Sequence, residues 1–531
     1  MRTKRSSILK SYLVVSGTSA LVGVVVGIVI FLYKWGAEKI VSLSQMLYEA
    51  VADKLYFLPL FFLALIILAV IGVKIVKHIP NASGGGIPTA EGILRGIVTF
   101  RWLRSFLGMV ISSYVSFFAG LPLGNEGPSV LIGTSLGKGT NNLFKNQGGF
   151  SRYAMTGGSA TAFAVATGAP LSGIVFVLEE VHRRFSPTLA LSALVAVMFG
   201  ASTNEVLCYI FNRSSALFHV SCSAVEIQYI YLAVIVGIVA GLVAVVFSKL
   251  YIALYNILGR INISNNIKFI FVFLFAGSMA LLFGQNHGSG HSLVDGVLVN
   301  EYSLGIIFSL LAIRTITVLV VGGAGVTGGL FVPILAIGAL IGGVVGKITI
   351  MLGASESVYA IVVVASIATL MSSVMRAPMT SIVFAIEALG ANTNVLFVVV
   401  AVAVAYFVGG LLKDKPLYDE ILLQKLAKMN KQNFTSPIEF DITVQEKSFI
   451  VGKSARDILW PPTCFVLQIK SKNNAMDSES TDGESEREIL QGDVLKIRVH
   501  NYDRISTFEL LEEIVGKQPT GTLKEIESKL K

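Results

Sequence analysis

Long apolar runs are the feature that most restricts how this chain can fold. Each of six runs approaches or reaches the ~20 apolar residues that a helix needs to cross a bilayer. They are residues 13–33, 59–76, 229–247, 268–283, 357–374 and 394–412. Charged residues make up only 14% of the chain, whereas soluble domains carry about 25%. The sequence therefore predicts an all-α polytopic membrane protein embedded in the lipid bilayer.

Basic residues flank the apolar region at both ends. The stretch MRTKR precedes the first run, and lysines follow the last one: Lys413, Lys415, Lys425 and Lys428. Because basic flanks stay on the cytoplasmic side, we predict that both termini are cytoplasmic in a multi-pass cell-membrane protein. The first run is too long for a signal peptide and no clear cleavage site follows it. The net charge of +9 reflects these flanks and does not indicate a nucleic-acid partner.

The composition changes near residue 413. We assign residues 1–412 to a membrane domain and residues 413–435 to a cytosolic linker helix. Residues 436–531 are expected to form a small α/β cytosolic domain, because runs such as FDITVQ and DVLKIRV alternate like strands. Within this domain, residues 471–488 are acidic and polar and predict a loop.

Two blocks of sequence recur in the membrane domain. APLSGIVFVLEE (169–180) returns as APMTSIVFAIEA (377–388), and GNEGPSVLIGTSLG (124–137) aligns with GLFVPILAIGALIG (329–342). The two blocks recur in the same order and at a nearly constant offset. A duplication explains this better than the alternative, which is a general Gly/Pro-rich membrane composition. Inverted repeats with helices broken by Gly and Pro are typical of secondary transporters. We place the two halves at about 55–215 and 228–412.

Three Gly/Pro segments are predicted to begin such broken helices: SGGGIPTAEG (83–92), GNEGPSV (124–130) and GGLFVPIL (328–335). Each places glycines before a proline that fits the first helical turn. The free N–H groups of a helix N-terminus bind anions. One such segment alone would also fit a loop or tight helix packing, but three in order predict an anion site.

These motifs resemble the signatures of the CLC chloride channels and transporters, and the resemblance covers roughly residues 10–425. Its fourth element is a tyrosine beyond the last span, in KPLYDEIL (415–422). The resemblance implies a homodimer in which each subunit carries its own chloride pathway. It also implies an anion site formed by Gly85, Gly86, Ile87, Asn125, Glu126, Gly127, Leu330, Phe331 and the hydroxyl of Tyr418.

The resemblance further implies that Glu126 is a gate. Its carboxylate competes with the anion for the same amides and moves away when protonated. The alternative is a structural carboxylate that caps a helix. In LEEVHRR (178–184), Glu180 matches the position that receives protons from the cytoplasm in CLC antiporters. This match favours a proton/chloride antiporter over a passive channel, although a solvated charge at a helix end is the alternative for Glu180.

Several residues depart from the family pattern or lie outside its motifs. Gly85 replaces a serine whose hydroxyl contacts the anion, which should weaken the preference for chloride over nitrate. Asn125 replaces an arginine. Because a fluoride-transporting branch of the family also departs from these motifs, fluoride is an alternative substrate. Glu179 aligns with Glu387 of the second repeat and is expected to be structural. Arg376 is expected to form an ion pair with Glu387, and attraction of the anion is the alternative role for Arg376.

The C-terminal region resembles the RCK_C (TrkA-C) domain, which commonly forms dimers. The similar segments are SFIVGKSARDILWPPTCFVLQIK (448–470) and QGDVLKIRVH (491–500). Some such domains bind cyclic di-AMP, whereas the alternative is a folding or dimerisation module without a ligand. The anion motifs weigh against a sensor subunit of a potassium uptake system. We expect no enzymatic activity, cofactor or metal, because no nucleophile–base pair or phosphate loop is evident and the cysteines have no paired spacing: Cys208, Cys222 and Cys464.

Overall fold

The computed structural model describes ten stretches of the chain. They are residues 2–143, 148–218, 220, 222–429, 438–446, 448–455, 458–461, 464–470, 488–499 and 504–518. The end of the predicted linker, residues 430–435, and most of the predicted acidic loop, residues 471–487, lie outside them.

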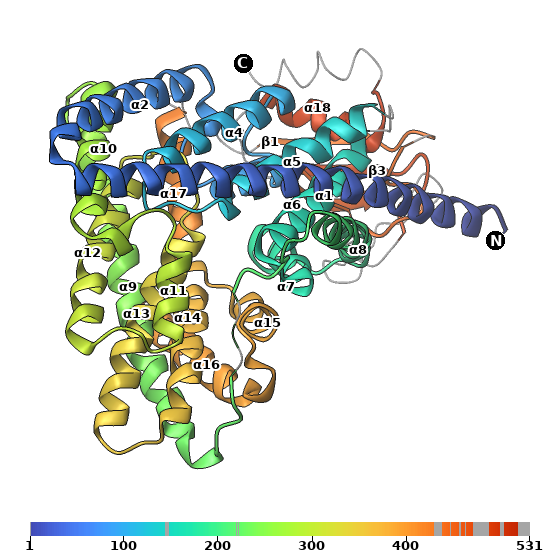
Figure 1. Ribbon diagram of the computed structural model, residues 1–531. Coiled ribbons are helices and arrows are strands. Elements are labelled where there is room, and N and C mark those ends of the chain that lie inside the picture. The colour runs from blue at the N-terminus through green and yellow to red at the C-terminus, as the bar shows by residue number, and fades with distance from the viewer. Residues whose placement is uncertain are drawn as a thin grey trace.

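Most of the described chain is helical, and a small sheet follows the helices (Figure 1). The α-helices are α1 (Arg2–Asp53), α2 (Leu58–His78), α3 (Ile87–Leu94), α4 (Trp102–Phe118), α5 (Glu126–Leu143), α6 (Gly148–Thr167), α7 (Pro170–Phe176), α8 (Pro187–Ile210), α9 (Ile230–Arg260), α10 (Asn265–Leu282), α11 (His291–Leu298), α12 (Leu304–Gly323), α13 (Phe331–Met351), α14 (Tyr359–Met375), α15 (Pro378–Ala388), α16 (Val395–Leu411), α17 (Leu417–Met429) and α18 (Arg504–Val515). The short turns are η1 (Leu55–Phe57), η2 (Pro80–Ala82), the π-helical η3 (Val177–Val181), η4 (Ile227–Tyr229), η5 (Gly284–Asn286), η6 (Glu356–Val358) and η7 (Ala391–Thr393).

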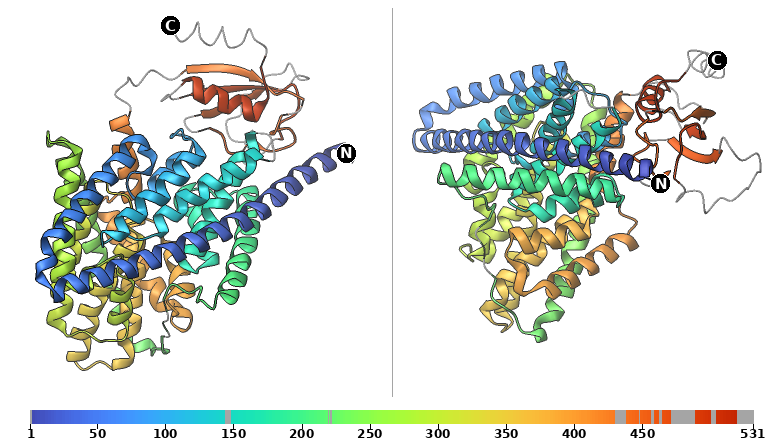
Figure 2. Two further views of the ribbon diagram at one scale, coloured as in Figure 1. Left: turned by 45° about the horizontal axis from the view of Figure 1, so that its top comes forward. Right: turned by 90° about the vertical axis from the view of Figure 1, so that its right-hand side faces the viewer.

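The structure confirms the membrane architecture. All six apolar runs lie in helices, namely α1, α2, α9, α10, α14 and α16. Within the described residues, eight helices are long and apolar enough to cross a membrane. With 52 residues, α1 is far longer than a bilayer requires, and it runs obliquely across the helical bundle (Figure 2). Its Gly23 permits close packing on α8, because a Cβ there would overlap the Ala196 carbonyl.

Four short helices, α3, α7, α11 and α15, have between seven and 11 residues and do not span a bilayer. Three of them carry proline in the first turn: Pro88 in α3, Pro170 in α7 and Pro378 in α15. A missing N–H costs nothing there, since no intrahelical acceptor exists for it. Of the four, only α3 begins at one of the three predicted Gly/Pro segments. The other two segments begin the longer helices α5 and α13, of 18 and 21 residues. Helix ends of this kind are tolerated at membrane depth where protein surrounds them.

The two repeat halves contact each other through equivalent residues. The Glu179 carboxylate accepts hydrogen bonds from the Met379 and Thr380 amides of α15, at 3.0 and 2.7 Å. Reciprocally, the Glu387 carboxylate accepts them from the Leu171 and Ser172 amides of α7, at 2.9 and 2.8 Å. A carboxylate stabilises the positive end of a helix. The predicted structural role of this glutamate pair is therefore confirmed.

The predicted ion pair between Arg376 and Glu387 is wrong. Both Glu387 oxygens accept bonds from the α7 amides, whereas the Arg376 guanidinium lies 4.1 Å from the centre of the Tyr406 ring. It also donates a hydrogen bond to the Tyr406 backbone oxygen at 3.1 Å. The amides of a helix from the other half satisfy the carboxylate, so it needs no arginine.

A sheet of three antiparallel strands in the order β1–β3–β2 follows the helices. The strands are β1 (Ile438–Thr443), β2 (Cys464–Lys470) and β3 (Val494–Val499). Side chains of β3 alternate between partly buried and buried, as the alternating run predicts. Together with α18, which packs Phe508 against Phe440 of β1, this sheet forms a small unit at one end of the helical bundle (Figure 2).

Candidate anion and proton site

The three glycine motifs meet backbone to backbone. Gly124 and Gly329, which align in the two repeats, exchange antiparallel N–H···O bonds of 2.8 and 2.7 Å. A Cβ at Gly86 would overlap the Gly127 carbonyl, and one at Gly127 would overlap the Gly85 carbonyl. Only glycine permits so close an approach, so the starts of α3, α5 and α13 converge on one place.

Free backbone amides surround this place. Among the residues that the structure describes, no acceptor is found for the N–H groups of Gly85, Gly86, Ile87, Asn125, Glu126, Gly127, Leu330 and Phe331. Unsatisfied N–H groups at several converging helix N-termini attract a negative charge. The predicted anion-binding residues of all three motifs are thus brought together, and their arrangement suits an anion held by backbone donors.

Glu126 is the first residue of α5, and its side chain is fully buried. The carboxylate folds back over Gly124, where a Cβ would overlap Oε2. No described residue donates a hydrogen bond to either oxygen, in contrast to Glu179 and Glu387. A buried carboxyl group without donors is costly. Its geometry therefore differs from that of a capping carboxylate, the structural alternative for this residue.

Tyr418 reaches the site from α17, just beyond the last apolar helix. It is 1% exposed, and its hydroxyl has no hydrogen-bond partner among the described residues. Lys425, also in α17, ties this helix to the first motif through the Ser83 carbonyl at 3.2 Å and the Thr89 hydroxyl at 2.8 Å. Burial lowers the pKa of Lys425 to about 8. The hydroxyl of Tyr418 is thus a hydrogen-bond donor that no described residue uses.

Glu180 lies in the π-helical turn η3 and is 1% exposed. No described residue forms a hydrogen bond with its Oε1. Its carboxyl group interacts electrostatically with that of the fully buried Glu91 in α3. Glu180 is therefore not a solvated charge at a helix end. Single π-turns within helices often mark functional sites.

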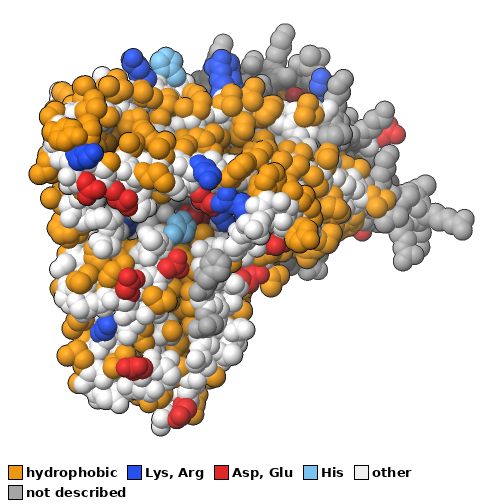
Figure 3. All heavy atoms as spheres, in the orientation of Figure 1, with side chains coloured by type: hydrophobic (Ala, Val, Ile, Leu, Met, Phe, Trp, Pro, Cys, Tyr) orange, Lys and Arg blue, Asp and Glu red, His pale blue; other side chains and the backbone are white. Residues whose placement is uncertain are grey.

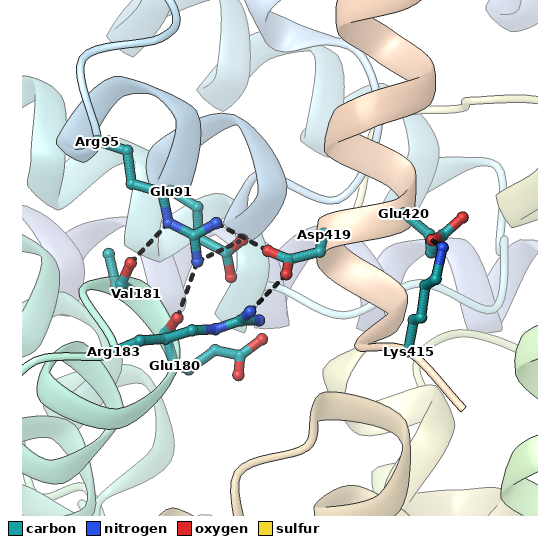
Figure 4. Close-up of polar contacts among 8 residues, drawn as sticks. All are labelled: Glu91, Arg95, Glu180, Val181, Arg183, Lys415, Asp419 and Glu420. Atoms are coloured by element: carbon teal, nitrogen blue, oxygen red, sulfur yellow. Dashed lines mark hydrogen bonds and ion pairs between the residues drawn. The ribbon is translucent and has the colours of Figure 1, made fainter. Parts of the chain in front are cut away.

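A cluster of charges encloses the two buried carboxyl groups, and Figure 4 shows it. Arg95 donates to the Glu180 and Val181 carbonyls at 3.1 and 2.9 Å, and to Asp419 at 2.8 Å. Arg183 also pairs with Asp419, at 2.6 Å. Because Asp419 follows Tyr418 in α17, these ion pairs connect the predicted anion tyrosine to the loop that carries Glu180.

Sequence reasoning missed Glu91, Arg95 and Asp419. A signal for Glu91 was present, because it is the lone carboxylate in the buried segment Ile87–Leu94, and intramembrane carboxylates are usually functional. Asp419 carried no comparable signal, since its arginine partner Arg95 lies 324 residues away in the chain. Among the described residues, no His/Cys/Asp/Glu group has the arrangement of a metal site.

Buried broken helices from two inverted halves, with converging amide donors and two buried carboxyl groups, define a membrane transport protein. Residues 66–410 match the family model for voltage gated chloride channels, and the chain belongs to this family, the CLC proteins. The fold prediction is confirmed by structural similarity to a slow cyanobacterial Cl⁻/H⁺ antiporter, with 24% identity and a TM-score of 0.72 over 78% of this chain and 99% of that one.

Two further crystal structures share the fold. A eukaryotic CLC transporter matches with 18% identity and a TM-score of 0.66, over 83% of this chain and 78% of that one. A CLC-type fluoride/proton antiporter matches with 20% identity and a TM-score of 0.64, over 77% of this chain and 97% of that one. At these identities the similarity establishes the fold, and it leaves the transported anion open.

Proposed function

We propose that this protein is a secondary active transporter that exchanges chloride for protons across the cell membrane. One observation carries the proposal: two buried carboxyl groups, Glu126 and Glu180, both interact electrostatically with the buried Tyr418. A passive anion pathway has no need for a second buried carboxyl group behind the gate. Ionisable residues inside a membrane protein often form proton relays, and this pair supplies the two ends of one.

In this proposal the gate works by competition. When Glu126 is ionised, its carboxylate occupies the region of free amides and excludes the anion. When it binds a proton, it no longer resembles an anion, and chloride replaces it between the amides and the Tyr418 hydroxyl. Glu180 and Glu91 hold the proton at the other end of the relay, since two carboxyl groups that interact electrostatically bind and release protons as a pair. Chloride and proton movement are thereby coupled.

The test uses purified protein in liposomes with an outward chloride gradient, a potassium ionophore to clamp the voltage, and an external pH electrode. Exchange predicts that protons enter the vesicles as chloride leaves, and that a protonophore then releases them. Chloride efflux without proton entry would establish the alternative, a passive CLC-type channel. Repeating the assay with fluoride and nitrate identifies the anion. Tyr418 and the otherwise conventional motifs favour chloride over fluoride, whereas Gly85 is expected to weaken the preference for chloride over nitrate.

Gly85 offers a direct test of anion preference. A Cβ at this position would meet nothing closer than the Gly328 carbonyl oxygen at 3.7 Å, so a serine fits. We expect Gly85→Ser to raise the chloride-over-nitrate preference about threefold to tenfold, because one added hydrogen bond contributes about 0.5–1.5 kcal/mol. Competition between the two anions in the liposome assay measures this ratio. An unchanged ratio would show that the hydroxyl does not reach the anion.

A control for this substitution is Gly17→Ser in α1, where a Cβ also meets no atom within 4 Å. It adds the same hydroxyl away from the three motifs. The anion preference of this variant should equal that of the wild type.

The proposal extends to the C-terminal unit as an RCK_C-like regulatory domain. Its Phe449 ring packs on Phe150 of α6, with ring centres 4.8 Å apart. Arg184, next to the Arg183 of the charge cluster, donates to the Ile458 carbonyl at 3.2 Å. A ligand that shifts this unit would act directly on the loop that follows Glu180. Regulation requires that the ligand bind one arrangement better than another.

We expect Phe449→Ala to reduce a response to cyclic di-AMP by at least about twofold, because losing an aromatic contact worth about 1 kcal/mol weakens the attachment. The proton-to-chloride ratio should stay unchanged. The measurement is exchange rate against cyclic di-AMP concentration, with Leu467→Ala in β2 as a control, since Leu467 is 37% exposed. A wild type that ignores cyclic di-AMP would favour a folding or dimerisation module.

The proposal also includes a homodimer and the placement of both termini in the cytoplasm. The homodimer is inferred from the family, and the orientation from the basic flanks. Chemical cross-linking in membranes tests the first inference, and the accessibility of tags at the two termini tests the second.

A further inference from the structure

A cavity of about 440 Å³ lies beside the predicted gate. Its wall is formed by α1, by the segment 214–217 and by the loop that precedes α11, and Asn125 of the second glycine motif also lines it. Charged and histidine side chains gather around a hollow near α1 on the face that Figure 3 shows. Because Asn125 precedes Glu126, the cavity reaches the residue next to the predicted gate.

His291, the first residue of α11, lies between this cavity and the gate. Its Nε2 atom is 3.6 Å from Oε1 of Glu126, and its Nδ1 atom is 2.6 Å from the hydroxyl of Ser289. The His291 side chain is 33% exposed, whereas that of Glu126 is fully buried. One ring nitrogen therefore faces the carboxylate, and the side chain still reaches the solvent.

Hydrogen bonds from a buried arginine hold the loop that carries His291 in place. The buried Arg314 donates to the Asn286 and Gly288 carbonyls at 3.1 and 2.9 Å, and also to the Ser289 carbonyl. Gly290 has φ of +102°, and a Cβ there would lie 2.7 Å from Arg314 Nη2. Glycine is therefore needed for the arginine to approach. The three hydrogen bonds from Arg314, together with the bond between Ser289 and His291, thus fix the position of His291 relative to Glu126.

We propose that His291 carries protons between the cavity and the gate. The imidazolium gives its Nε2 proton to Oε1 of Glu126, which leaves a neutral imidazole and a neutral carboxyl group. Water in the cavity then returns a proton to the imidazole, and the reverse sequence empties the gate. The 3.6 Å separation is longer than a direct hydrogen bond, so transfer uses a small ring rotation or one bridging water. This inference rests on the proposed exchange.

The other charged groups around the cavity are unsuited to this role. His287 bonds Ser44 through its Nε2 atom at 2.9 Å and packs against the Tyr48 ring. Glu38 is paired with Arg213. Lys34 of α1 interacts electrostatically with Glu126, but a lysine ordinarily does not change its charge between about pH 5 and 8. Arg314 is committed to backbone carbonyls. Histidine is the side chain whose charge ordinarily changes between about pH 5 and 8.

The test is His291→Ala in full-length protein, reconstituted in liposomes and assayed from about pH 5 to 8 on both sides. We expect the exchange rate near pH 7.5 to fall about tenfold. This loss is smaller than the ~100-fold or greater loss expected on removing many general acid–base groups, because water can also bring protons to the gate. The proton-to-chloride ratio should be unchanged. The rate should recover towards pH 5, and imidazole added to the buffer should restore it at neutral pH.

His287→Gln is the matched control, because it removes a second histidine from the same cavity without removing a contact to Glu126. Its pH profile should follow that of the wild type. If His291→Ala matches the wild type at every pH, or loses activity that neither acid nor imidazole restores, the relay role is overturned. Failure of the proposed exchange is distinguishable, since the wild type itself would then move chloride without protons.

Discussion

Glu126→Gln is expected to abolish proton movement while chloride movement continues. Glutamine resembles the protonated form of the gate but does not bind or release a proton near neutral pH. It also cannot compete as an anion for the free amides at the starts of α3, α5 and α13. We expect proton flux to fall at least about 100-fold, the contribution of an essential acid–base group. Chloride efflux should remain at least as fast as in the wild type, because the gate no longer closes.

The measurement combines an external pH electrode with a chloride electrode on the same vesicles. Glu49→Gln is a suitable control, since Glu49 is an exposed carboxylate of α1 that accepts a hydrogen bond from Gln45 at 3.0 Å. It should keep both fluxes. Persistent proton entry in Glu126→Gln would mean that Glu126 is a buried structural carboxylate and that protons follow another route.

The second large effect is expected at Glu180, where substitution by glutamine should also stop proton movement. The amide cannot pass a proton on, so the relay is broken at its inner end, by at least about 100-fold in proton flux. Chloride should still move, because Glu126 remains able to gate. Since Oε1 of Glu180 has no hydrogen-bond partner among the described residues, the thermal stability of this variant should change little.

Its neighbour provides the matched comparison. Glu179→Gln removes a charge that accepts three hydrogen bonds from Met379 and Thr380, and bonds to charged groups contribute about 1.5–3 kcal/mol each. We expect a clearly lower unfolding temperature in detergent but an unchanged proton-to-chloride ratio. If Glu180→Gln instead lowered the unfolding temperature and left proton movement coupled to chloride movement, Glu180 would be a structural carboxylate like Glu179.

Much of the fold could be predicted from the sequence because membrane helices and repeats leave local signals. The apolar runs predicted the helices. The alignment of Glu179 with Glu387 predicted that Glu179 is structural, and it distinguished Glu179 from the adjacent Glu180. Glu179 and Glu180 are neighbours in the helical turn η3, where adjacent side chains point in different directions. Glu179 can therefore reach the other repeat half while Glu180 lies buried beside Glu91.

The rest of the site depends on contacts between segments far apart in the chain. Asp419 and His291 meet Arg95 and Glu126 only after folding, and no local pattern announces such pairs. The error at Arg376 has the same origin. The proximity of Arg376 to Glu387 in the sequence suggested an ion pair. The Glu387 carboxylate instead accepts hydrogen bonds from amides of α7, more than 200 residues away in the chain.

The reciprocal binding of Glu179 and Glu387 has a consequence for biosynthesis. Each half of the chain contains a short helix whose amino-terminal amides are satisfied by a carboxylate from the other half. The partner of Thr380 is separated from it by 201 residues, so the first half must wait in the membrane, with α7 uncapped, until the second half has been translated. Each half therefore depends on a carboxylate from the other half to satisfy the first amides of its short helix. Packing of the two halves against each other can therefore be completed only after both have been made.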